Sequence, residues 1–184
     1  MSTIELFLIA VGLSMDAFAV AIGKGLSVER VSPKQATITG VWFGGFQALM
    51  PIMGYLLGIS FAEFVESIDH WVAFALLWLI GLDMIHDSLS KNCEKSDPDF
   101  SAKKMLPLAI ATSIAALAVG ISLAFLKEPI VTAASAIGVI TFIFSFAGVY
   151  IGNVFGCRYK SKAEFLGGAI LLIIGIKIVV EHTL

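Results

Sequence analysis

The chain has 184 residues, of which 58% are hydrophobic and 14% charged, and its mean hydropathy is +0.95. A soluble domain of this size needs about 25% charged residues to cover its surface, so the composition excludes a soluble fold and indicates lipid as the solvent. The net charge of −2 carries no information about partners. The sequence has no basic patch interleaved with aromatic residues, so it gives no indication of nucleic-acid binding.

Hydropathy predicts six helices, each near the 20 or so apolar residues needed to cross a hydrocarbon core. In chain order they cover Ile4–Ile22, Thr37–Ile59, Trp71–Leu89, Met105–Leu126, Val131–Ile151 and Ala163–Val180. The most polar stretch, Lys91–Lys104, contains Asp97-Pro98-Asp99 and is predicted to be a loop. The chain is therefore expected to be an all-α membrane protein of two units, residues 1–90 and 105–184, with a cytoplasmic linker at 91–104.

The basic residues gather in alternate loops. Ten of the twelve Lys and Arg residues fall in the first, third and fifth loops: Lys24, Arg30, Lys34, Lys91, Lys95, Lys103, Lys104, Arg158, Lys160 and Lys162. Cytoplasmic loops carry the excess of Lys and Arg in membrane proteins. Both termini are therefore predicted to be extracytoplasmic.

The two halves of the chain align with each other. The segment Ser14–Val20 matches Ser113–Val119 at an offset of 99 residues. Further matches are Gly40 with Gly138, Gly54 with Gly152 and Gly58 with Gly156 at an offset of 98, and Ile80-Gly81 with Ile174-Gly175 at 94. Because each unit has three helices, an odd number, the second is predicted to be inverted relative to the first. Inverted repeats are typical of secondary transporters, whose site lies near the midplane.

Asp16 is the main candidate for a functional residue. It lies about twelve residues into the first helix, roughly 18 Å deep, near the middle of a ~30 Å hydrocarbon core. A carboxylate at that depth costs at least ~2.5 kcal/mol, so it should face protein, water or a cation. The alternative is a neutral Asp that forms a hydrogen bond between helices.

Other oxygen-bearing residues are expected at similar depth. Gln47 lies about ten residues into the second helix, roughly 15 Å deep, and Pro51 frees a backbone carbonyl about one turn earlier. Together with Asp16, the further candidates are Ser14, Thr112 and Ser113. Oxygen ligands of this kind suit hard divalent cations such as manganese and magnesium. Gln47 has the alternative interpretation of an amide that only links helices.

Asp83 is the remaining acidic candidate. It lies toward the cytoplasmic end of the third helix and could line an entry path or pair with a basic residue. Lys177 aligns with it, but inversion would separate the two along the membrane normal. The sequence contains no phosphate-binding loop and no facing nucleophile and base, so an enzyme is not expected, and transport would depend on an ion gradient or run downhill. A membrane structural or sensory protein is the competing hypothesis.

Four segments resemble the MntP family of bacterial manganese efflux pumps. They are Ser14-Met15-Asp16-Ala17-Phe18-Ala19 with Gly23-Lys24-Gly25, then Phe43–Pro51, His70–Phe74 and Ala163–Gly168. The resemblance implies a multi-pass exporter in the bacterial plasma membrane that protects cells from excess manganese. Manganese would be its substrate, with no permanently bound cofactor, and the oligomeric state is left open.

The family's two aspartates fall on different residue types in this chain. The first corresponds to Asp16, whereas the second corresponds to Ala115. One charge in place of two should weaken binding of a divalent ion. Three interpretations remain open: Asp83 supplies the missing charge, the substrate is a different divalent cation, or the chain is an engineered or impaired form.

Overall fold

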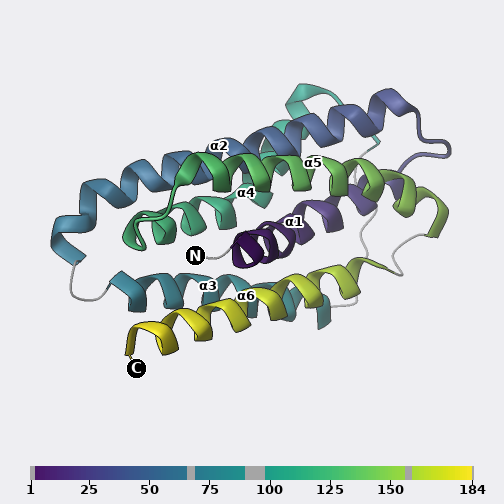
Figure 1. Ribbon diagram of the computed structural model, residues 1–184. Coiled ribbons are helices and arrows are strands. Elements are labelled where there is room, and N and C mark those ends of the chain that lie inside the picture. The colour runs from purple at the N-terminus through teal and green to yellow at the C-terminus, as the bar shows by residue number, and fades with distance from the viewer. Residues whose placement is uncertain (1–2, 66–68, 90–97, 156–158, 184) are drawn as a thin grey trace.

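The computed structural model describes residues 3–65, 69–89, 98–155 and 159–183, and these form six helices (Figure 1). The helices are α1 (Thr3–Leu26), α2 (Pro33–Val65), α3 (Asp69–Leu89), α4 (Ala102–Phe125), α5 (Ile130–Phe155) and α6 (Lys160–Thr183). All six predicted helices are confirmed, and α2 is the longest at 33 residues. The predicted linker lies partly outside the described residues, at 90–97.

Four of the helices have the length and composition of membrane spans. These are α1, α4 and α5 over their whole lengths and α2 over Pro33–Ser60, while α3 contains a shorter apolar stretch, Phe74–His86. Consecutive helices run in opposite directions, so the described chain ends at α1 and α6 lie at the same end of the bundle (Figure 1). The chain is thus a helical protein with several candidate spans.

The two halves of the chain interlock. α1 packs mainly on α5 and α6, and α4 packs mainly on α2 and α3. In contrast, α1 barely contacts α2, and α4 barely contacts α5. The helices α1 and α4 are central, because 61% and 56% of their most apolar stretches are buried, against 33% for α2 and for α5.

Glycines allow the closest helix crossings. A Cβ added to Gly54 would lie 2.0 Å from the carbonyl oxygen of Leu117, and one added to Gly152 would lie 2.1 Å from that of Ile22. Small residues permit such backbone approach between membrane helices. The crossings of α2 with α4 and of α1 with α5 therefore depend on these glycines.

Candidate functional site

Six polar side chains near the middle of α1, α2, α4 and α5 are buried. This buried polar set comprises Ser14, Gln47, Thr112, Ser113, Thr141 and Ser145, each no more than 4% exposed. Four of them, Ser14, Gln47, Thr112 and Ser113, are candidates from the sequence. Burying a polar group is costly unless it has a hydrogen-bond partner. A buried polar atom without such a partner is therefore a candidate to bind a ligand.

Gln47 links the two central helices. Its Nε2 donates to the carbonyl oxygen of Thr112 at 3.0 Å on α4 and approaches that of Leu13 at 3.4 Å on α1. Its Oε1 is buried and has no hydrogen-bond partner among the described residues. Pro51 lies inside α2 and cannot donate to the Gln47 carbonyl one turn earlier. Gln47 therefore fixes α1 and α4 through its nitrogen and leaves oxygen atoms for a ligand.

Some hydroxyl groups of the set have hydrogen-bond partners and others have none. Ser14 Oγ donates to the Ala10 carbonyl and lies 2.8 Å from Thr141 Oγ1 on α5. Within the described chain, Ser113 Oγ and Ser145 Oγ are buried without a hydrogen-bond partner. An unsatisfied buried hydroxyl costs about 1–3 kcal/mol, so these atoms are suited to receive a ligand.

Asp16 lies about one helical turn along α1 from the Leu13 carbonyl that Gln47 contacts. It is partly buried on α1, between the buried residues Met15 and Ala17. It follows Leu13 by three residues, so the two occupy neighbouring positions on the helix surface. Ala115 is also partly buried and follows Thr112 by three residues. Gln47 thus contacts the carbonyls that precede both positions at which the family resemblance places an aspartate.

Asp83 does not belong to this set, because it is exposed on α3. His86, also on α3, is exposed, and the side chain of Asp87 lies outside the described residues. Lys177, which aligns with Asp83, instead forms an ion pair with Glu5 on α1. Within the described residues, no three His, Cys, Asp or Glu side chains gather as a metal site.

Sequence reasoning missed two members of the set and one buried lysine. Ser145 could have been found, because it lies 98 residues after Gln47, the offset that relates the second helices of the repeat. Lys24 was counted as a loop residue, but it lies in α1 and is fully buried. Its Nζ donates to the Asp99 carbonyl at 2.8 Å and lies 5.1 Å from the centre of the Phe100 ring.

Comparison with known proteins supports the family resemblance. A family model described as "Putative manganese efflux pump" matches residues 30–179. A protein of that name, MntP, from Desulfitobacterium hafniense is 61% identical over 182 residues, covering 99% of this chain and 96% of the relative. Its counterpart in Acetivibrio thermocellus is 56% identical over 184 residues, covering 99% and 92%. The Campylobacter jejuni counterpart is 53% identical over 179 residues, covering 97% and 96%.

No solved structure matches the chain. The assignment therefore depends on sequence relatives, and both the family model and the relatives cover most of the chain. The chain belongs to the MntP family.

Proposed function

We propose that this protein exports Mn²⁺ across the bacterial plasma membrane as a secondary transporter, by alternating access between its two halves. The observation that carries this proposal is the position of Gln47. It joins α1 and α4 about one helical turn from Asp16, and it belongs to a buried set of hydroxyl and amide groups. The family relatives are named as manganese efflux pumps, which supports manganese as the cargo.

The architecture that we propose is two inverted three-helix repeats with six spans and extracytoplasmic termini. Equivalent contacts support the repeat: Gly40 lies against Phe142, and Gly44 lies against Gly138. The repeat offset of 98 converts one contact into the other, because Gly40 aligns with Gly138 and Phe142 aligns with Gly44. Contacts between α3 and α6 behave in the same way, with Gly81 against Gly168 and Gly175 against Phe74 at an offset of 94.

The chemistry of the proposed site is that of a hard cation bound by oxygen. Carboxylate, carbonyl, hydroxyl and water ligands suit Mn²⁺ and Mg²⁺ alike, and Asp16 supplies the negative charge. A buried carboxylate is tolerated in a membrane protein when it faces the interior of the bundle or a cation pathway. With Ala115 in the equivalent position of α4, a divalent ion would be bound by one charge, which favours weak binding and ready release.

Alternating access gives Gln47 a specific part in this proposal. Its amide bridges one helix from each half, so a relative movement of α1 and α4 must lengthen at least one of its two contacts. The amide could then rotate its oxygen toward the ion. Asp83, exposed on α3, is proposed to act only at the cytoplasmic entrance.

Metal efflux from Mn²⁺-loaded cells tests the site. We expect Asp16→Asn to lower the export rate at least tenfold, because it removes the charge and keeps the shape. Ala115→Asp should preserve or raise export, because it restores a second carboxylate. Asp83→Asn is the matched comparison, and it should keep more than half of the activity. Full export by Asp16→Asn would refute the site, and loss of export in Asp83→Asn would show that Asp83 supplies the missing charge.

A second measurement separates transport of manganese from the competing hypotheses. Vesicles containing the purified protein, loaded with either Mn²⁺ or Mg²⁺, should release Mn²⁺ faster than protein-free vesicles. Faster release of Mg²⁺ would assign a different divalent cation. Equal retention of both metals with and without the protein would support a structural or sensory role.

A further inference from the structure

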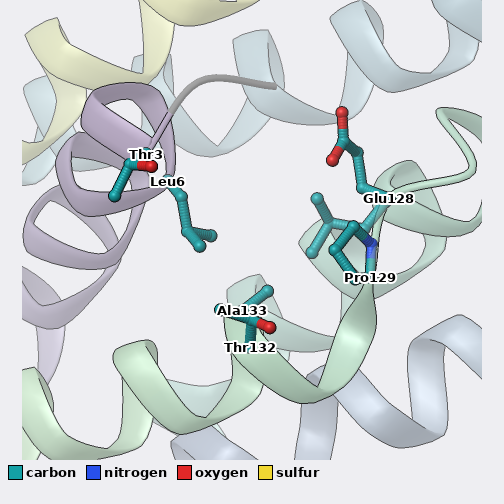
Figure 2. A pocket seen from close by; sticks show the side chains of 7 residues that line it. Thr3, Leu6, Glu128, Pro129, Thr132 and Ala133 are labelled. Carbon is teal, nitrogen blue, oxygen red and sulfur yellow. The ribbon is translucent and has the colours of Figure 1, made fainter.

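A pocket of about 160 Å³ opens at the end of the bundle where α4 turns into α5. It is lined by Thr3, Leu6, Leu123, Glu128, Pro129, Thr132 and Ala133. Figure 2 shows the Glu128 side chain on one side of this space and Thr3 on the opposite side. The pocket thus combines one carboxylate and two hydroxyl groups with apolar walls. In the proposed topology this end is extracytoplasmic.

A layer of apolar side chains lies between the pocket and the buried polar set. Ile9, Leu13 and Leu123 are each at most 2% exposed and belong to one hydrophobic cluster. From Leu6 at the pocket to Leu13, next to Ser14, α1 rises about 10 Å. The pocket is therefore separated from the polar set by roughly two helical turns of apolar packing.

Residues equivalent to two of the pocket's lining residues lie buried at the other end of the bundle. The repeat offset of 99 pairs the pocket residues Leu6 and Leu123 with Met105 and Lys24, and both of these counterparts are fully buried. Lys24 is held by the Asp99 carbonyl and lies against the ring of Phe100. At the end opposite the pocket, the described residues thus place a buried lysine against the segment that leads into α4.

We propose that the pocket is the outer mouth of the transport path and that Glu128 binds the divalent cation there as it leaves. The structure then represents a conformation closed to the cytoplasm. One carboxylate and hydroxyl groups would hold a cation that keeps most of its waters, as small hard cations do. Such a site is weak and releases its ion quickly. This inference depends on the proposed function and topology, but it involves different residues.

Thiol labelling tests the proposal. Thr132→Cys is made in a background in which Cys93 and Cys157 are replaced by Ser, and intact cells are treated with a membrane-impermeant maleimide. We expect labelling from outside, slowed at least threefold by external Mn²⁺. Adding Glu128→Gln should abolish that protection. Lys127→Cys, an exposed neighbour that does not line the pocket, should be labelled without protection by Mn²⁺.

Each result decides between two outcomes. A thiol at position 132 that reacts only from the cytoplasmic side, or from neither side, would overturn the outer mouth. Absence of Mn²⁺ protection, or equal protection with Glu128→Gln, would overturn the cation site. If Asp16→Asn stops export while the pocket is unprotected, this inference fails alone. If the pocket is protected by Mn²⁺ while Asp16→Asn exports normally, the proposed central site fails alone.

Discussion

Adding a methyl group at either of two equivalent glycines should destabilise the bundle. In Gly54→Ala the new carbon would lie 2.0 Å from the Leu117 carbonyl oxygen, and in Gly152→Ala it would lie 2.1 Å from that of Ile22, where ordinary contact begins at 3.4 Å. Overpacking typically costs about 1–3 kcal/mol. The facing atom is backbone and cannot rotate away, so we expect a loss near 3 kcal/mol.

The control lies on the same helix as Gly54. Gly45 has no neighbour within 4 Å of an added Cβ, so Gly45→Ala meets no clash and should gain up to about 1 kcal/mol in helix propensity. A loss near 3 kcal/mol lowers the melting temperature of a chain of this length by about 6–12 °C.

The assay is the melting of the purified protein in detergent, followed by tryptophan fluorescence. Gly54→Ala and Gly152→Ala should melt well below the parent chain, and Gly45→Ala at or above it. If Gly54→Ala and Gly45→Ala melt together, the close-crossing argument is wrong. If only one of the two clashing variants is destabilised, the equivalence of the halves is wrong.

Three further predictions concern polar contacts. Gln47→Met should reduce Mn²⁺ efflux at limiting metal at least tenfold. It should cost only about 1 kcal/mol of stability, which is the net value of a neutral hydrogen bond. Unchanged efflux would show that Gln47 only links the helices. Lys24→Met removes the bond to the Asp99 carbonyl, so limited proteolysis at residues 98–101 should become faster, and an unchanged cleavage rate would contradict the proposed closure. For the Glu5–Lys177 ion pair, the side chains are 13% and 45% exposed, so solvent reaches the lysine end. A double-mutant cycle with Glu5→Gln and Lys177→Met should therefore give a coupling below about 1 kcal/mol in detergent melting, and a larger coupling would contradict this screening.

Hydropathy was sufficient to predict the six helices, because long apolar runs specify spans without knowledge of the fold. The start of α2 was placed too late, at Thr37 instead of Pro33. A capping box begins this helix: Gln35 Oε1 accepts from the backbone N–H of Ser32 at 2.9 Å, and Ser32 Oγ accepts from that of Gln35 at 3.3 Å. Such polar caps do not contribute to a hydropathy average, although the pattern is readable in the sequence.

The buried polar set was predictable only in part. Depth along each helix identified Ser14 and Gln47, because position in the sequence fixes depth in a straight span. The pairing of Ser14 with Thr141 joins residues 127 positions apart and depends on how α1 crosses α5. The burial of Lys24 depends in the same way on the segment at Asp99 folding back over it. Neither contact can be predicted from the sequence that surrounds the residues involved.

The scarcity of contacts between α1 and α2, and between α4 and α5, has a consequence for biosynthesis. When the ribosome has made only residues 1–90, the partners of α1 and α2 do not yet exist, so the early helices must wait in the bilayer for the later ones. A chain truncated there should be degraded by membrane proteases. The two fragments produced together should be able to assemble, since most of the packing joins one to the other.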